Sequence, residues 1–303
     1  SFRSVHGLCV RLPLGLVPSN SFGARRGQMT GGRLAIKCAI KSAVKHVLMK
    51  THAPDLSGSS RILTFHSVGY RRDETNVSPR MFREQMAWLS DHYPIISLKE
   101  AAAGKPGVAV TLDDGYRDNL LYAAPILEEF HIPATVFVVA GFMGKVLCQE
   151  DDPTTGTLLN PEEICALHRI GVTIGSHSMT HRRLALLSPI EQQQEIRESA
   201  RILSDILRYP VTQFAYPFGT ARDYTASTMQ LLQIEGFELA VSNQFGSNPQ
   251  GANPYDLRRI PIDCTDDLDF FRAKVEERLD LLRVFESQAG LRLRQFLNKV
   301  TGA

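Results

Sequence analysis

Strand-like and helix-like segments alternate along most of this chain, from residue 62 to about residue 285. The strand-like runs, such as residues 108–111 and 134–139, are short and apolar and rich in β-branched residues, as in strands buried on both faces. The segments between them carry apolar residues at the period of an amphipathic helix. About seven such units over roughly 220 residues favour a parallel sheet that closes on itself over an open sheet. We therefore predict an α/β fold, a (β/α) barrel that is seven-stranded and somewhat distorted.

Cap and turn signals in the sequence set the expected bounds of these segments. Strands are expected over residues 62–66, 95–98, 108–111, 134–139, 172–175, 212–216, 239–241 and 259–262. Helices are expected from residue 78 and over residues 117–130, 162–170, 189–207, 225–236 and 268–285, with a turn over residues 99–103. The barrel domain, with its closing C-terminal helix, is thus predicted to span residues 59–303.

Residues 1–58 form the other predicted region, a leader followed by a basic amphipathic helix. In residues 33–50 the apolar side chains lie on one side, and Arg33, Lys37, Lys41 and Lys45 recur every four residues on the other. Such a helix either docks on a folded domain with its basic face in water or lies on an anionic membrane surface. Peripheral membrane contact through this helix is therefore one of two expectations.

The charge balance excludes one class of partner. The chain of 303 residues has 34 Lys and Arg against 32 Asp and Glu, a net charge of +2, and so lacks the concentrated basic surface of a nucleic-acid-binding protein. No run of 18 apolar residues occurs, so no transmembrane helix is expected. The five cysteines are scattered, which indicates neither a disulfide framework nor a thiolate metal site. The sequence does not predict an oligomeric state.

Two adjacent carboxylates, Asp113 and Asp114, directly follow the strand expected around residues 108–111. This places them at the carboxyl end of the strand, which is where α/β proteins bind their ligands. The two carboxylates repel each other, and burying them costs free energy unless a cation or hydrogen-bond donors compensate. The pair therefore predicts either a cation at this rim or the N-cap and first turn of the next helix.

Histidines stand at the ends of two other expected strands, His66 in one place and His177 with His181 in the other. The i, i+4 spacing of His177 and His181 puts both rings on one face if a helical turn begins at Ser178. One carboxylate and two neutral imidazoles leave coordination positions open for water and substrate, as in a catalytic metal site. Zinc is the metal expected for this donor set, and cobalt, nickel, manganese and iron also suit it.

The segments 110–116 (VTLDDGY) and 176–181 (SHSMTH) resemble the first two motifs of the polysaccharide deacetylases, the family-four carbohydrate esterases. The resemblance covers roughly residues 60–265. It implies that Asp113 is the general base and that Asp114, His177 and His181 are the ligands of a divalent metal ion. It also implies removal of N-acetyl groups from an N-acetylated amino-sugar polymer or oligomer, with release of acetate.

Two later motifs of the family are altered in this chain. The Arg-x-Pro-Tyr motif is matched only in part by residues 215–219 (AYPFG), with Ala215 in place of the arginine that pairs with the base. The resemblance implies that Arg258 or Arg259 supplies that charge and that Tyr216 offers its backbone N–H to an oxyanion. No histidine follows His181, so the late Leu-x-His motif is missing. Residues 64–69 (TFHSVG) instead resemble the early element of the poly-N-acetylglucosamine deacetylase-like branch, which makes His66 the expected catalytic acid.

Other functions remain as alternatives. The altered motifs also suit a catalytically silent glycan-binding protein on the same fold. A glycoside hydrolase that uses Asp113 and Asp114 is a further alternative, although adjacent strand residues point to opposite faces and do not flank a bond easily. A non-haem iron oxygenase is disfavoured by the strand–helix alternation. A glycan substrate favours the bacterial envelope as the location, whereas the thiols and the absence of a recognisable signal segment favour the cytoplasm.

Overall fold

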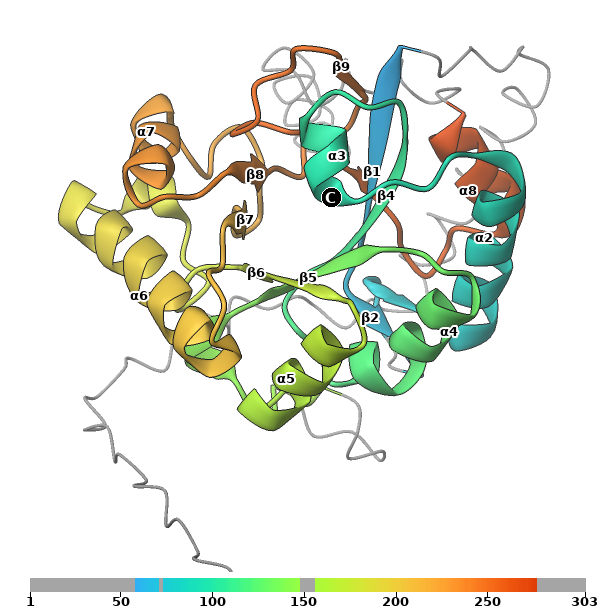
Figure 1. Ribbon diagram of the computed structural model, residues 1–303, viewed down its shortest axis with the longest axis horizontal. Helices are drawn as coiled ribbons and strands as arrows, with labels where there is room; N and C mark the ends of the chain where they lie inside the picture. Colours follow the sequence, from blue (N-terminus) through green and yellow to red (C-terminus); the bar gives the residue numbers. More distant parts are fainter. Residues whose placement is uncertain (1–57, 71–72, 148–155, 277–303) are drawn as a thin grey trace, which may run out of the picture.

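The computed structural model describes residues 58–70, 73–147 and 156–276, and their strands form a curled sheet with helices around its outside (Figure 1). Seven strands run parallel in the order β10, β1, β4, β5, β6, β7 and β8. Their bounds are Ile260–Pro261, Ser59–Phe65, Gly107–Leu112, Ala134–Val138, Thr173–Ser176, Gln213–Ala215 and Leu239–Val241. An eighth strand, β9 (Asn248–Pro249), pairs antiparallel with β1, and β2 (Ser67–Val68) pairs with β3 (Asn76–Val77) in a separate small sheet.

The two end strands of the sheet, β8 and β10, meet through an irregular segment rather than through a regular ladder. Val241 in β8 forms an isolated parallel bridge with Leu257, which precedes β10 in the chain. The Ser242 N–H donates to the Leu257 carbonyl at 2.8 Å, and the Arg259 N–H donates to the Gln244 carbonyl at 3.1 Å. The barrel is thus distorted at this seam, as predicted.

Helices on the outside of the sheet begin where the sequence carries cap residues. The principal ones are α2 (Pro79–His92), α3 (Leu98–Ala102), α4 (Ala124–Glu129), α5 (Pro161–Arg169), α6 (Pro189–Leu207), α7 (Ala226–Ile234) and α8 (Leu268–Val275), with the short helical turns η1 (Asn119–Ala123), η2 (Ala140–Phe142) and η3 (Leu184–Leu186). Helices α2, α5 and α6 have proline in the first turn, and the side chains of Ser78, Asn160 and Ser188 cap them. A capped N-terminus with proline in the first turn starts a helix sharply, which explains why these starts were predicted well.

Three predicted segments differ from the structure. Residues 95–98 are not a strand: Ile95 forms only one isolated bridge, and α3 occupies most of the expected turn over residues 99–103. The reason is the capping box between Ser97 and Glu100, which starts a helix there. The helix expected over residues 117–130 begins later, with the wide turn η1 before α4.

Some predictions fall on residues that the structure does not describe. The amphipathic helix over residues 33–50 lies outside the described residues, as does the part of the closing helix beyond residue 276. The domain boundary at residues 58 and 59 and the membrane contact therefore stay predictions. Within the described residues, no helix is both long and apolar enough to cross a membrane.

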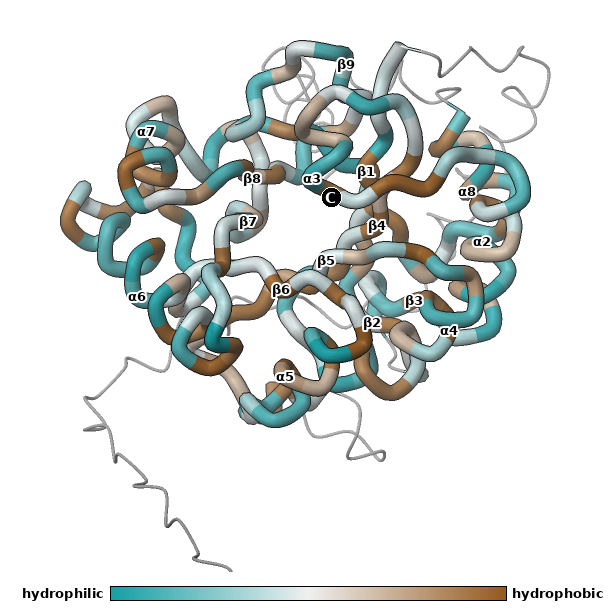
Figure 2. The backbone as a smooth tube through the Cα atoms, viewed as in Figure 1, coloured by the Kyte–Doolittle hydropathy of each residue, from teal (hydrophilic) through white to brown (hydrophobic). Residues whose placement is uncertain are grey.

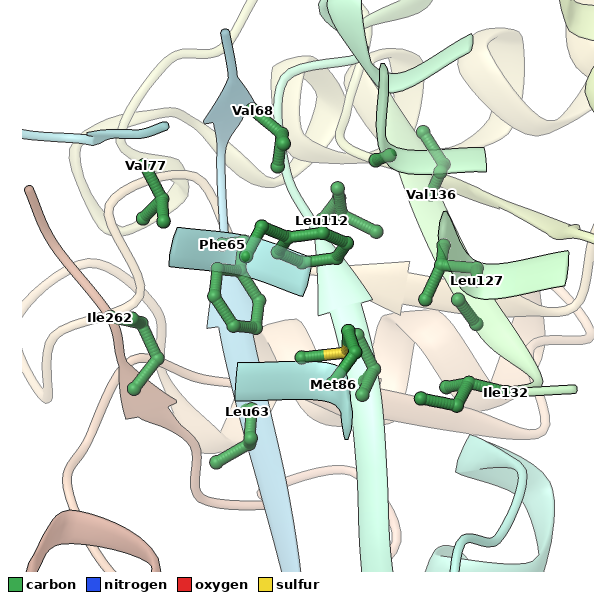
Figure 3. Packing of buried hydrophobic residues seen from close by; sticks show 14 of the residues in the cluster. Leu63, Phe65, Val68, Val77, Met86, Leu112, Leu127, Ile132, Val136 and Ile262 are labelled. Carbon is green, nitrogen blue, oxygen red and sulfur yellow. The ribbon is translucent and has the colours of Figure 1, made fainter. Parts of the chain in front are cut away.

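Alternate strand residues build two apolar layers. One set fills the inside of the barrel and includes Ile62, Ala109 and Phe137. The other set packs between the sheet and the surrounding helices; Figure 3 shows Leu63, Phe65, Leu112 and Val136 of this layer with Met86 of α2. The strands are correspondingly among the most hydrophobic parts of the backbone in Figure 2. Burial on both faces explains the continuous apolar runs in the sequence.

Glycine is required at one position inside the barrel. A Cβ atom on Gly175 of β6 would overlap the ring of Phe137 on the neighbouring strand β5. The absent side chain leaves room for this ring, which fills the interior below the carboxyl ends of the strands. The Arg259 guanidinium lies over the same ring, 5.8 Å from its centroid. Phe137 is thus part of the floor beneath the polar groups described next.

Candidate metal centre and catalytic site

Three of the predicted site residues directly follow the last residue of a strand at the same end of the sheet. His66 follows β1, Asp113 follows β4, and His177 follows β6. Lateral hydrogen bonds continue the sheet at these positions: the Asp113 N–H donates to the Phe65 carbonyl and the His177 N–H donates to the Val138 carbonyl, both at 2.9 Å. The parallel sheet therefore brings segments that are far apart in the sequence to one rim.

Asp114, His177 and His181 form a buried group of candidate metal ligands, with one ligand atom of each within 4.8 Å of the others. The Asp114 Oδ1 atom lies 3.6 Å from Nε2 of His177 and 3.4 Å from Nε2 of His181. Two tetrahedral ligands at about 2.1 Å from an ion are separated by about 3.4 Å. The donor set and its spacing thus fit a small divalent ion.

The His177 ring is fixed in orientation by the backbone of β7. Its Nδ1 atom lies 2.8 Å from the carbonyl oxygen of Ala215, so Nδ1 carries the proton and donates to that carbonyl. This arrangement leaves Nε2 as an acceptor atom that faces Asp114, as in metal sites where the other ring nitrogen is hydrogen-bonded. Ala215, which lacks the side chain of the family motif, thus contributes its carbonyl to the site.

The two histidines converge through a tight loop and not through the helical turn that the spacing predicted. Residues 177–183 contain no helix, and Ser178 and His181 have left-handed φ angles of 63° and 56°. The His181 N–H donates to Ser178 Oγ at 3.0 Å. Four of the six non-glycine residues with positive φ in the described part of the chain lie at this site: Asp114, Ser178, His181 and Phe218. Such a conformation costs on the order of 1–3 kcal/mol, so the surroundings must hold it in place.

Asp113 is held by the guanidinium of Arg259 in a two-pronged ion pair, with distances of 2.7 and 2.6 Å from Nη1 and Nη2 to the two carboxylate oxygens. Arg259 also donates through Nε to the Ser242 carbonyl at 2.7 Å and through Nη1 to Thr111 Oγ1 at 3.2 Å. Both side chains of the pair are almost fully buried. Of the two arginines that the sequence offered, the structure pairs Arg259 with Asp113, whereas Arg258 Nη1 donates to the Phe245 carbonyl at 3.4 Å.

The protonation of Asp113 reflects opposing effects of its surroundings. Burial is the largest single effect and raises the pKa of Asp113, but the charge of Arg259, the charge of His177, the hydrogen bonds from Arg259 and the charge of His66 together outweigh it. The net result is a pKa below the ordinary value of an aspartate. Asp113 is therefore ionised at neutral pH and can accept a proton.

His66 lies beside Asp113 across the junction of β1 and β4, because Phe65 and Leu112 are register partners immediately before them. Its contribution to the lowered pKa of Asp113 reflects this proximity. The backbone carbonyl of His66 accepts a hydrogen bond from Asn119 Nδ2 at 2.8 Å, which ties the end of β1 to η1. The structure thus places the predicted acid next to the predicted base.

The oxyanion role expected for Tyr216 does not fit its contacts. Its N–H already donates to the Val241 carbonyl at 3.1 Å, and its buried phenol donates to the Tyr255 carbonyl at 2.8 Å. Tyr216 is a core residue of the β7–β8 region. Phe218, two residues later, has its ring 4.8 Å from that of His181, and within the described residues its N–H donates to no acceptor. Residue by residue, Phe218 also takes the tyrosine position of the Arg-x-Pro-Tyr motif.

One residue that sequence reasoning missed supports the histidine loop. Glu195 of α6 is buried and accepts hydrogen bonds from the backbone of Met179 and Thr180, at 3.0 and 2.8 Å. A signal for it was present in the sequence, because Glu195 falls among the buried positions of α6 together with Ile196 and Ser199. A carboxylate on the buried side of a helix needs a hydrogen-bonding partner.

The described residues also enclose a cavity of about 370 Å³ at the other end of the barrel. It lies at the starts of β5, β6 and β7, and its lining includes Thr135, Thr173, Gln213 and the residues Lys99 and Glu238. None of the predicted site residues lines it. The cavity is therefore separate from the rim that carries the candidate ligands.

Most of the rim residues lie in a stretch of the chain that matches a known protein family. The family model for polysaccharide deacetylase matches residues 100–237. This chain contains a polysaccharide deacetylase domain. The matched residues include Asp113, Asp114, His177 and His181, whereas His66 and Arg259 lie outside the match.

Relatives of this chain include two bacterial proteins. The putative polysaccharide deacetylase YxkH of Bacillus subtilis is 28% identical over 210 residues, which cover 66% of this chain and 70% of that protein. The poly-beta-1,6-N-acetyl-D-glucosamine N-deacetylase of Staphylococcus aureus is 23% identical over 222 residues, which cover 67% of this chain and 73% of that protein. The resemblance stated from the sequence motifs is thereby confirmed.

Solved structures share the fold of this chain. IcaB from Ammonifex degensii superposes with a TM-score of 0.62 at 24% identity, over 75% of this chain and 99% of that one. The Streptococcus pyogenes deacetylase PplD, in complex with acetate, superposes with a TM-score of 0.62 at 22% identity, over 72% and 98%. The predicted α/β barrel is confirmed.

Proposed function

We propose that this protein removes N-acetyl groups from an N-acetylated amino-sugar polymer or oligomer, by hydrolysis of the acetamide C–N bond with release of acetate. The observation that carries the proposal is the buried Asp113–Arg259 pair beside the Asp114, His177 and His181 group. An ionised carboxylate next to a three-ligand set supplies a base at a position where a water molecule can be activated. The names of the B. subtilis and S. aureus relatives support a glycan as the substrate.

Asp114, His177 and His181 are the residues that would hold a divalent metal ion. When bound there, the ion supplies Lewis-acid polarisation of the acetamide carbonyl and lowers the pKa of water. Zinc is the metal we propose, because one carboxylate and two imidazoles are a common zinc donor set, while cobalt, nickel and manganese also bind such ligands. A glycoside hydrolase would not need these ligands, so the group favours the deacetylase over that alternative.

The residues of the chain then have separate roles. Asp113, kept ionised by Arg259, takes the proton of the attacking water. His66 donates a proton to the departing amine, which is a poor leaving group as an anion. The N–H of Phe218 replaces that of Tyr216 as the proposed donor to the oxyanion, because the Tyr216 N–H already donates to Val241 whereas that of Phe218 donates to no acceptor within the described residues.

The test is release of acetate from N-acetylglucosamine oligomers by the purified protein, before and after chelation and after addition of zinc, cobalt, nickel or manganese. We expect activity to disappear with the chelator and to return with at least one metal. Binding of the glycans without acetate release under any metal would replace this proposal by the silent glycan-binding protein. Shortened oligomers in the presence of the chelator would instead indicate a glycoside hydrolase.

A further inference from the structure

The loop between the two candidate histidine ligands needs an external support. His177 is fixed by the sheet, since its N–H donates to Val138 and its ring to Ala215. His181 has no such strand to hold it, and both it and Ser178 adopt left-handed φ angles that non-glycine residues avoid. The distance between the two imidazoles therefore depends on what keeps residues 178–181 in this conformation.

The carboxylate of Glu195 supports this loop from the side of α6. Its Oε2 atom accepts the N–H groups of Met179 at 3.0 Å and Thr180 at 2.8 Å, and its Oε1 atom accepts the hydroxyl of Thr180. All three donors belong to the two residues midway between the histidines. Glu195 is 7% exposed, so these hydrogen bonds are shielded from competing water.

Helical turn η2 also supports the same loop, through the carbonyl groups. The N–H of Ala140 donates to the Ser178 carbonyl at 3.1 Å, and the N–H of Gly141 donates to the Met179 carbonyl at 2.9 Å. A Cβ atom on Gly141 would lie 2.5 Å from that carbonyl oxygen, which no side chain tolerates. The N–H groups of the loop are thus held by Glu195 and its carbonyls by η2.

Helix α6 is itself anchored next to the site. One turn after Glu195, the hydroxyl of Ser199 lies 2.7 Å from that of Ser176, the last residue of β6 before His177. Glu195 and Ser199 are both buried on the same side of α6. The carboxylate therefore acts from a helix that is fixed to the strand carrying the first histidine.

We propose that Glu195 is a positioning residue that preorganises His181 relative to His177 for the metal ion, without touching the metal itself. The inference rests on the proposed function for the identity of Asp114, His177 and His181 as a metal site. Removal of a group that orients metal ligands commonly lowers metal affinity by about 10–100-fold. The hydrogen bonds of Glu195 hold the backbone of the loop in the metal-free protein as well.

The first experiment measures zinc affinity of the full chain by competition with a chromophoric chelator. We expect Glu195→Ala to weaken zinc binding by about 10–100-fold. We expect Glu195→Gln to stay within a few-fold of the native protein, because its amide oxygen can accept both N–H groups while its NH₂ donates to the Thr180 hydroxyl. The matched control is Glu235→Ala, since Glu235 is another largely buried carboxylate bound to α6, through Arg197 and Gln193, but lies away from the histidine loop.

The second experiment follows amide hydrogen exchange in the metal-free protein. Faster exchange at Met179 and Thr180 in Glu195→Ala, with native exchange in the central strands, is the expected result. If the alanine variant does not fold, Thr180→Val, which removes the hydroxyl contact alone, takes its place in both measurements, with the same direction and a smaller effect.

The two measurements separate this inference from the function it rests on. Zinc affinity in Glu195→Ala equal to that of Glu235→Ala, or native exchange at Met179 and Thr180, would overturn the positioning role. If the native protein binds no divalent metal, the proposed metal site is wrong. The exchange measurement then decides by itself whether Glu195 holds the loop.

Discussion

The charged groups at the carboxyl ends of the strands are more deeply buried than the ion pair at the amino ends. At the carboxyl ends of the strands, the charged groups Asp113, Asp114 and Arg259 are buried. At the amino ends, the ion pair between Lys99 and Glu238 is largely exposed, with 69% and 45% of the two side chains accessible. Burial of charge is not confined to the rim, because Arg61 in β1 is also fully buried, but the rim brings several buried charges together. Burial strengthens the interaction between charges but costs desolvation free energy, so a group of buried charges at one rim is expected at a functional site.

The largest effects are expected from the two adjacent carboxylates at the rim. Asp113→Asn and Asp114→Asn should each lower acetate release by about 10²–10⁴-fold, the usual contribution of a general base and a comparable loss for a missing ligand. Only Asp114→Asn should also weaken zinc binding, because Asp114 faces the two histidines. Acetate assays and metal titration on both variants check this. Equal loss of zinc in the two variants would contradict the division of roles.

The next largest effect is a loss of stability when Arg259, the ion-pair partner of the buried Asp113, is replaced. Arg259→Met leaves the Asp113 carboxylate buried without its cation, and losing one member of a buried pair costs about 3–5 kcal/mol. The measurement is urea unfolding of the metal-free protein. The double variant with Asp113→Asn should recover a large part of that loss, since no charge then remains unpaired. Additive losses in the double variant would show that the pair is not coupled.

At the amino ends of the strands, replacement of a buried apolar residue should lower stability and leave acetate release unchanged. Leu98 of α3 is 3% exposed and belongs to the same apolar cluster as Ile62 and Ala109 inside the barrel. Leu98→Ala should cost about 2–5 kcal/mol in the free energy of unfolding. Acetate release and zinc affinity, measured well below the unfolding temperature, should stay native. A selective loss of activity would mean that the two ends are coupled through the barrel interior.

The smallest effect is expected from the exposed ion pair. Lys99→Ala breaks the contact with Glu238, but both side chains are solvated and screened by salt. Neither the melting temperature nor acetate release should change measurably. A drop in melting temperature comparable to that of Arg259→Met would show that charge at this end is as consequential as charge at the rim.

Much of the fold could be predicted because its signals are local. Caps such as Ser78 and Ser188 mark helix starts, and continuously apolar runs mark strands buried on both faces. The failure at residues 95–98 has the same origin, since this mostly apolar four-residue segment resembles a strand while the Ser97–Glu100 capping box starts a helix. In the site, the positions of Asp113 and His177 at strand ends were predicted, whereas the left-handed loop between the histidines was not. That conformation depends on Glu195 and η2, which are distant in the sequence.

By itself, the sequence determined the alternation of strands and helices and the placing of carboxylates and imidazoles at strand ends, because periodicity and strand-end position are properties of short segments. The tertiary structure alone decided which arginine meets Asp113, since Arg259 is 146 positions away and reaches it only when β10 lies beside β1. It also gave His177 its partner, the carbonyl of Ala215, a contact that no side-chain motif records. Closing the sheet creates these neighbours, and the buried charges at the rim depend on that closure.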